Sequence, residues 1–124
     1  MSDPLTDLAY ANLLGVFNER DDAARAKAAE QTYAEDIVFH DPDSTVTGRA
    51  AVDAKAKELL ESSPGFAFRP AGPVRISHDL VMLPWQFGPE GADPVVSGLD
   101  VSLVADGRIA VLYTLLDGPP PTQA

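Results

Sequence analysis

Two aspartates stand in apolar surroundings where a carboxyl group could act as an acid or a base. Asp41 follows an apolar run, shares strand parity with Ile37 and Phe39, and therefore faces the same space as they do. If that space is the core, loss of hydration raises the pKa of Asp41, and such a carboxylate can take a proton from carbon next to a carbonyl. The alternative is that Asp41 and Pro42 only begin a turn, as aspartate before proline often does.

The second candidate, Asp100, lies inside the apolar run 95–104. Alternation places it on the face of Gly98 and Ser102, opposite the larger apolar side chains Leu99, Val101 and Leu103. The pattern alone therefore predicts that Asp100 faces solvent.

Around these acids we select six further candidate pocket residues, namely Tyr10, Leu13, Phe17, Phe39, His40 and Trp85. The apolar members are pocket walls or plain core, and the sequence leaves both open. Trp85, the only tryptophan, is more typical of a core residue than of a ligand platform. His40 points to the strand face opposite Asp41, which favours a structural role over a catalytic one.

The charge and composition of the chain limit the classes of partner and cofactor that we expect. The 9 basic and 19 acidic residues give a net charge of -10, which repels nucleic-acid phosphates and anionic lipid surfaces. No apolar run approaches the roughly 20 residues of a membrane span, and no signal sequence is visible, so we expect a cytoplasmic protein. With no cysteine and two distant histidines we expect no metal centre, although His40, Asp41 and Asp43 could hold a hard cation weakly. No glycine-rich phosphate loop is present, and we expect no cofactor.

The elements that must position these residues are helices first and strands afterwards. Asp3 and Pro4 are typical of a helix start, and apolar spacing or helix-favouring composition predicts helices over 4–17, 23–33 and 49–62. β-branched and aromatic runs between turn signals predict strands over 37–41, 66–69, 74–77, 80–87, 95–104 and 109–116. This order predicts one α+β domain over 1–124, with an ordered core of about 5–117, a curved antiparallel sheet around the helices and a proline-rich tail at 118–124.

Several strands are apolar at both parities, as in Val81, Met82 and Leu83. Both faces of the sheet are then covered, and a second copy of the chain is the simplest cover for the outer face. We therefore expect a homodimer formed through the outer face of the sheet.

Short motifs resemble a known family. Residues 33–42 (YAEDIVFHDP), 48–52 (GRAAV), 98–100 (GLD) and 106–109 (DGRI) resemble the SnoaL-like and ketosteroid isomerase-like branch of the nuclear transport factor two superfamily. The resemblance implies a cystatin-like α+β cone, in which three N-terminal helices pack in a curved, mostly antiparallel sheet and the open end holds an apolar pocket. Family members include steroid isomerases, polyketide cyclases, epoxide hydrolases and proteins with no known reaction, so the fold does not decide the activity.

The resemblance also assigns roles to the two acids. Asp41 falls where ketosteroid isomerases keep their general base, and Asp100 falls where they keep a neutral aspartic acid and where polyketide cyclases keep their acid/base. The tyrosine of the isomerases falls near Leu13, which cannot donate a hydrogen bond. The implied function is a pocket for a small apolar molecule, with acid/base isomerisation or cyclisation of a carbonyl compound by Asp41 and Asp100.

The alternative is a non-catalytic ligand-binding or dimerisation domain. Epoxide hydrolysis is a third and weaker interpretation, because it needs an arginine beside the acids and the sequence does not place Arg49, Arg69 or Arg75 at the pocket.

Overall fold

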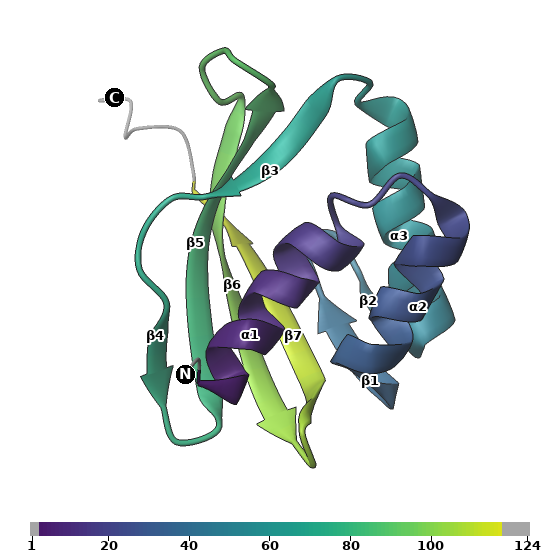
Figure 1. The fold of residues 1–124 in the computed structure, drawn as a ribbon, viewed down its shortest axis with the longest axis vertical. Helices are drawn as coiled ribbons and strands as arrows, with labels where there is room; N and C mark the ends of the chain where they lie inside the picture. The colour runs from purple at the N-terminus through teal and green to yellow at the C-terminus, as the bar shows by residue number, and fades with distance from the viewer. Residues whose placement is uncertain (1–2, 118–124) are drawn as a thin grey trace.

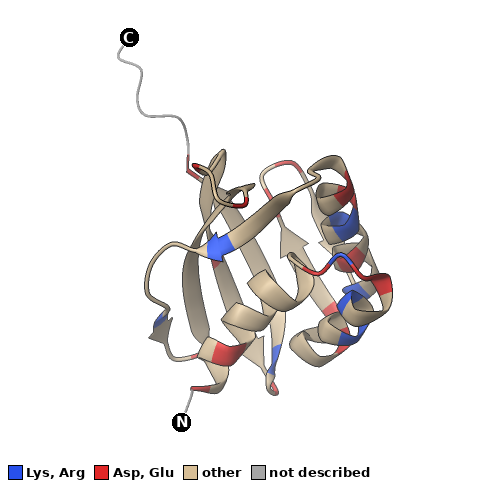
Figure 2. Ribbon diagram, turned by 45° about the horizontal axis from the view of Figure 1, so that its top comes forward, with Lys and Arg blue, Asp and Glu red and all other residues tan. Residues whose placement is uncertain are grey.

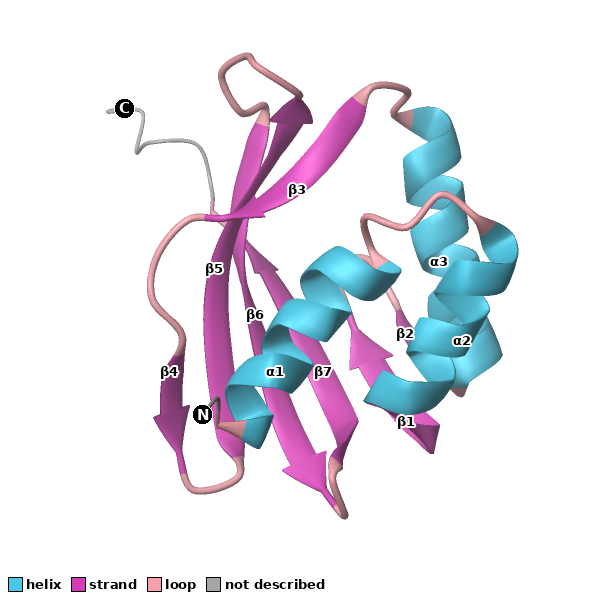
Figure 3. Cartoon of the chain, in the orientation of Figure 1, coloured by secondary structure: helices cyan, strands magenta, loops and turns pink. Residues whose placement is uncertain are grey.

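Helices precede a sheet in the structure, a computed structural model that describes residues 3–117 (Figures 1 and 3). The predicted tail at 118–124 lies outside the described residues. The helical elements are α1 (Pro4–Tyr10), its π-helical continuation η1 (Ala11–Val16), α2 (Asp22–Thr32) and α3 (Arg49–Ser62). The strands are β1 (Tyr33–His40), β2 (Thr45–Thr47), β3 (Phe66–Pro70), β4 (Arg75–Ser77), β5 (Leu80–Pro89), β6 (Val96–Ala105) and β7 (Arg108–Leu116).

Local signals explain where these elements begin and turn. The Asp3 side chain accepts from the Leu5 N–H at 2.8 Å, and Pro4 follows it as the first helical residue. Asp21 caps α2 by accepting from the Ala24 N–H at 2.8 Å. Asp106 and Gly107 take positive φ angles of 52° and 78° between β6 and β7, as a two-residue hairpin turn requires.

Three local predictions differ from the structure. The first helix widens into the π-helix η1 at Ala11, a change that apolar spacing does not reveal. Tyr33 ends α2 with an extended backbone and already belongs to β1, so the strand starts four residues earlier than predicted. The short strand β2 was not predicted, because the chain turns at Asp41 and returns beside β1 within a few residues.

The sheet is curved and mostly antiparallel, with the strand order β2-β1-β7-β6-β5-β3 and β4 paired with β5. Only the pairing of β1 with β7 is parallel among the described strands. The predicted α+β architecture is thus confirmed.

The helices cover one face of this sheet, with α1 against β5 and β6 and α3 against β1 and β2 (Figure 1). Arg25 of α2 is 1% exposed and joins the helices, since its guanidinium pairs with Asp53 of α3 at 2.5 Å and with Asp22 at 2.6 Å. No helix among residues 3–117 is long and apolar enough to cross a bilayer.

Candidate functional site

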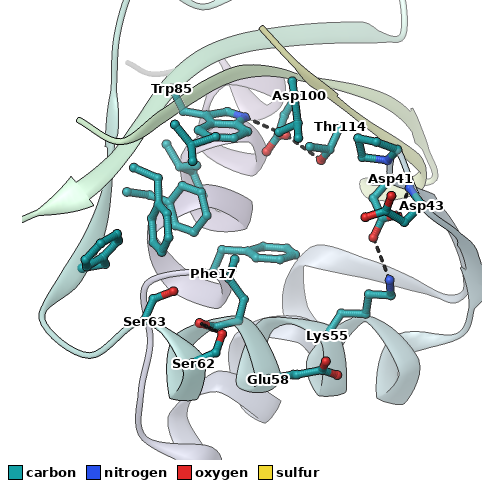
Figure 4. A pocket seen from close by; sticks show the side chains of 18 of the residues that line it. Phe17, Asp41, Asp43, Lys55, Glu58, Ser62, Ser63, Trp85, Asp100 and Thr114 are labelled. Carbon is teal, nitrogen blue, oxygen red and sulfur yellow. Dashed lines mark hydrogen bonds and ion pairs between the residues drawn. The ribbon is translucent and has the colours of Figure 1, made fainter. Parts of the chain in front are cut away.

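A cavity of about 560 Å³ lies between α3, the end of η1 and the concave face of the sheet (Figure 4). Its walls are mainly aromatic and aliphatic, with Leu13, Phe17, Phe39, Leu59, Phe66, Phe68, Trp85, Phe87, Val95, Val96 and Leu116 among the lining residues. The rings pack on one another, for example Phe68 against Trp85 with centroids 5.2 Å apart. The volume is in the usual range for a site that encloses a small organic molecule.

Asp100 lies in the wall of this cavity, on the concave face of β6. It stands opposite Leu83 of β5 and Thr114 of β7, and only 8% of its surface is exposed. The prediction from alternation was therefore wrong about the face, because the helices cover the side that carries Gly98, Asp100 and Ser102.

Three side chains donate hydrogen bonds to the Asp100 carboxylate. Trp85 Nε1 and Thr114 Oγ1 both donate to Oδ1, at 2.9 and 2.8 Å, and Asn12 Nδ2 donates to Oδ2 at 2.9 Å. Figure 4 shows the first two contacts beside the cavity. Among the described residues no lysine or arginine forms an ion pair with Asp100.

The electrostatics of Asp100 follow from this environment. Burial raises the pKa of Asp100 to about 6, and the hydrogen bonds from Thr114, Trp85 and Asn12 oppose that rise only in part. A carboxyl group with this pKa changes protonation state close to neutral pH, which suits it to proton transfer.

Two residues that support Asp100 were not found from the sequence. Asn12 of η1 is 1% exposed, and its Oδ1 accepts a 2.5 Å hydrogen bond from the hydroxyl of the fully buried Tyr33. Burial raises the pKa of Tyr33 well above its ordinary value, and the negative charge of Asp100 adds to the rise. The one available signal was a polar residue at position 12, on the buried side of an otherwise apolar helix.

Gly98 supports the site through the side chain that it lacks. It pairs with Trp85 across β5 and β6, and a Cβ at this position would lie 2.5 Å from the indole ring and against the Leu115 carbonyl oxygen. The missing side chain therefore provides the space in which the Trp85 indole reaches Asp100.

Asp41 also lines the cavity, but its pKa is shifted in the direction opposite to the one predicted. Its Oδ1 accepts from the N–H groups of Asp43 and Ser44 at 2.9 and 2.7 Å, and its Oδ2 accepts from Lys55 Nζ at 2.7 Å. Burial acts to raise the pKa of Asp41, but Lys55 and the two N–H groups outweigh it and hold the pKa below its ordinary value. The predicted rise was wrong, because α3 supplies the Lys55 ammonium and the turn that was the alternative interpretation supplies the two N–H groups.

Two of the six predicted pocket residues do not line the cavity. His40 lies on the outer face, where its ring stacks on Tyr113 at 4.6 Å and its Nδ1 contacts Thr45 Oγ1 at 2.8 Å. Tyr10 is half-buried against the core on α1. The other four, Leu13, Phe17, Phe39 and Trp85, are both core and cavity wall.

The charged side chains that line the cavity are mostly acidic. Besides Asp41, Lys55 and Asp100, its lining includes Asp43 and Glu58, and no arginine among the described residues. Within residues 3–117 no group of three or more His, Asp or Glu side chains is arranged to hold a metal ion. His40 faces away from Asp41 and Asp43, so the weak cation site suggested by the sequence does not form.

Comparisons with known proteins agree with the fold. A family model described as a SnoaL-like domain matches residues 11–112. No curated protein matches the chain.

Among solved structures, one from Agrobacterium tumefaciens strain C58, called a "putative isomerase of the SnoaL-like family", has 26% identity and a TM-score of 0.85, and the match covers 93% of this chain and 98% of that one. A "putative polyketide cyclase" from Sinorhizobium meliloti has 17% identity and a TM-score of 0.69, with 91% and 99% covered. A "putative ketosteroid isomerase" from Kribbella flavida has 17% identity and a TM-score of 0.70, with 97% and 84% covered.

Proposed function

The chain belongs to the SnoaL-like domain family, and on that premise we propose that its cavity binds a small apolar carbonyl compound with which Asp100 exchanges a proton, as in an isomerase or a cyclase. One observation carries the proposal: a carboxyl group buried in an apolar cavity, held by three neutral donors and by no cation among the described residues. Such a group is ready to change protonation state without metal or cofactor.

The proposed chemistry uses Asp100 first as a base and then as an acid. With a pKa of about 6, roughly nine-tenths of the Asp100 side chains are ionised at pH 7. The carboxylate takes a proton from the carbon next to the carbonyl, and the electron pair of that C–H bond moves to form an enolate. Asp100, now neutral, returns the proton to the same carbon, which gives hydrogen exchange, or, where a neighbouring C=C bond extends the enolate, to the far carbon of that bond, so that the isomerisation balances without a further reactant.

Asp41 and Lys55 take a different role in this proposal. An ion pair holds Asp41 in the charged form with a lowered pKa, which makes it a weaker base than Asp100. The Lys55 ammonium has three donors, and its hydrogen bonds to Asp41 and Ser44 occupy two of them. The third donor can stabilise negative charge on the enolate oxygen.

The lining also limits the charge of the ligand. Among the described residues, the cavity lining has one lysine and the four acids Asp41, Asp43, Glu58 and Asp100, and the whole chain carries a net charge of -10. Carboxylate or phosphate groups are repelled by such a field. We therefore propose a substrate without anionic groups, and the mainly apolar walls of the cavity favour an uncharged one.

The test is hydrogen exchange at the carbon next to a carbonyl. Uncharged cyclic ketones such as 2-tetralone are incubated with the protein in D₂O, and deuterium uptake is followed by NMR. We expect uptake above the buffer rate with wild type, a loss of at least 100-fold in Asp100→Asn, and wild-type rates in the control Asp36→Asn, whose carboxylate is exposed on β1. Equal uptake with wild type and Asp100→Asn, or no uptake with any ketone of the panel, would overturn the catalytic proposal.

A second candidate function is ligand binding without catalysis. Leu13 lines the cavity where ketosteroid isomerases have a tyrosine, so the cavity lacks that hydroxyl donor. Ketones that bind and saturate the protein but take up no deuterium would favour this alternative.

We also propose a homodimer through the outer face of the sheet. Strands β5, β6 and β7 carry few charges, as their mostly tan ribbons in Figure 2 show, and most of the charged residues lie on the helices and loops. On the outer face, Leu99 pairs with Leu115 and Val101 with Tyr113, and Tyr113 and Leu115 remain 42% and 50% exposed. An apolar face of this kind is typical of an interface.

Light scattering tests the dimer. We expect a dimeric mass for wild type and for Leu14→Lys, which changes an exposed leucine of η1, and a monomeric mass for Val101→Lys. A monomeric wild type at micromolar concentration would contradict the proposal.

A cytoplasmic location stays a prediction, which fractionation of cells that make the protein would test.

A further inference from the structure

The two oxygens of Asp100 are not equivalent. An ionised carboxylate has about four lone-pair positions, two on each oxygen. Trp85 and Thr114 occupy both positions on Oδ1, whereas Asn12 is the one described donor to Oδ2. The remaining lone pair therefore belongs to Oδ2, which makes Oδ2 the oxygen that is free to accept a further proton.

The neighbour of that atom, Asn12, is itself held in one orientation. The Tyr33 hydroxyl donates to Asn12 Oδ1, so Asn12 Nδ2 turns toward Asp100. The reversed amide would direct its carbonyl oxygen at the carboxylate, and two acceptors would then face each other in a buried site. All three groups are buried, with Asn12 and Tyr33 at 1% and 0% exposure, so solvent does not replace either hydrogen bond.

The backbone is adapted to bring Asn12 to this place. The N–H of Phe17 donates to the carbonyl of Asn12 at 3.1 Å, which is the five-residue spacing of the π-helix η1. This hydrogen bond spans one residue more than an α-helical one, which changes which side chains face the sheet, and short π-helical turns recur at functional sites. Here the turn places a polar residue between Tyr33 of β1 and Asp100 of β6.

We propose that Asn12 is a positioning residue that fixes Oδ2 of Asp100 as the proton-exchanging atom, and that Tyr33 acts through Asn12 by fixing its amide. The inference rests on the proposed function of the cavity and adds two residues to it. Neither Asn12 nor Tyr33 lines the cavity among the described residues, so both act on the ligand only through Asp100.

Other titratable groups near Asp100 are few and identifiable. Tyr33 stands behind Asn12, and Asp41, Asp43, Lys55 and Glu58 share the cavity with Asp100. The substitutions below leave these four charged side chains in place. A change in the titration of Asp100 therefore reports on the hydrogen bonds of Asn12 and Tyr33.

The experiment is an NMR titration of the Asp100 carboxyl carbon in full-length protein labelled with ¹³C at aspartate. Asn12→Leu removes the donor to Oδ2 and is expected to raise the pKa of Asp100 by about 1. Tyr33→Phe removes no hydrogen bond from Asp100 itself, yet is expected to raise the pKa by about 0.5, because the released amide no longer donates steadily. Tyr113→Phe, the same change on the outer face, is the matched control and leaves the titration unchanged.

The outcomes separate this inference from the function of the cavity. If folded Tyr33→Phe titrates like wild type, the relay through Asn12 is overturned, whatever the fate of ketone exchange. A raised pKa in Tyr33→Phe without any ketone exchange in wild type would keep the relay and remove the proposed function. Should Asn12→Leu fail to fold, the conservative Tyr33→Phe decides the question alone.

Discussion

Replacing Asp100 by asparagine tests the burial of this carboxylate through the pH dependence of stability. Burial moves the pKa of Asp100 from 3.8 to about 6, and this difference of about 2.2 corresponds to about 3 kcal/mol. Because the folded state prefers the neutral acid, that contribution to stability is fully present below about pH 4 and is lost as the pH rises through 6. Asparagine is neutral at every pH, so Asp100→Asn does not lose this contribution to stability as the pH rises.

The substitution also has a cost that does not depend on pH. If the asparagine oxygen keeps the hydrogen bonds from Trp85 and Thr114, its amide nitrogen faces the Asn12 donor, and losing this buried contact costs roughly 1–3 kcal/mol. We therefore expect Asp100→Asn to be less stable than wild type at pH 4. At pH 7.5 we expect it to be equally stable or up to about 2 kcal/mol more stable.

Urea denaturation of both proteins between pH 4 and 7.5 measures this difference. The free energy of unfolding of Asp100→Asn, relative to wild type, is expected to increase by about 2.4 kcal/mol across that range, because part of the contribution of about 3 kcal/mol is already lost at pH 4. Asp36→Asn, a change of the same type at an exposed position, is the control and runs parallel to wild type. A difference between Asp100→Asn and wild type that stays constant with pH would refute the reasoning.

Three further substitutions probe the surroundings of the site. Gly98→Ala forces the indole of Trp85 to move and is expected to cost at least about 2 kcal/mol in urea denaturation, with changed emission of this single tryptophan; wild-type emission and stability would contradict the close contact. Lys55→Met removes the cation beside Asp41, so an NMR titration is expected to show the pKa of Asp41 rising toward its ordinary value, and an unchanged pKa would mean that the ion pair does not form. Arg25→Met removes the buried guanidinium that donates to Asp53 and to the Glu19 carbonyl and is expected to cost about 1–3 kcal/mol in the same denaturation assay, whereas wild-type stability would argue against this link between the helices.

The fold was largely predictable from the sequence because its signals are local. Caps, hairpin turns and apolar spacing gave the order of the elements, and α3 has the predicted bounds of 49–62. The π-helical turn at Asn12 was not predictable in this way, because its wider spacing depends on packing against the sheet rather than on residue type.

The candidate site was predictable only in part. Alternation correctly separated Asp100 from Leu99 and Val101, but which face the helices cover is a tertiary property that alternation does not contain. The resemblance to the family, in which Asp100 falls at the position of a pocket acid, indicated the opposite face, and the structure has Asp100 in the cavity wall.

The prediction for Asp41 was also correct only where it depended on the local sequence. Its strand parity correctly predicted that it reaches the cavity, and the proline after it correctly indicated a turn. The pKa was predicted in the wrong direction because the ion pair joins it to Lys55, fourteen residues further along the chain. The local sequence pattern does not predict this contact, because the contact depends on how α3 packs against β1.

The most direct test of the central claim is an NMR titration of the side-chain carboxyl carbons of Asp100 and Asp41 in the wild-type protein. The account predicts that Asp100 titrates near pH 6 and Asp41 below its ordinary value of 3.8. An Asp100 that titrates near 3.8, like an exposed carboxylate, would contradict the claim that this buried group exchanges protons near neutral pH.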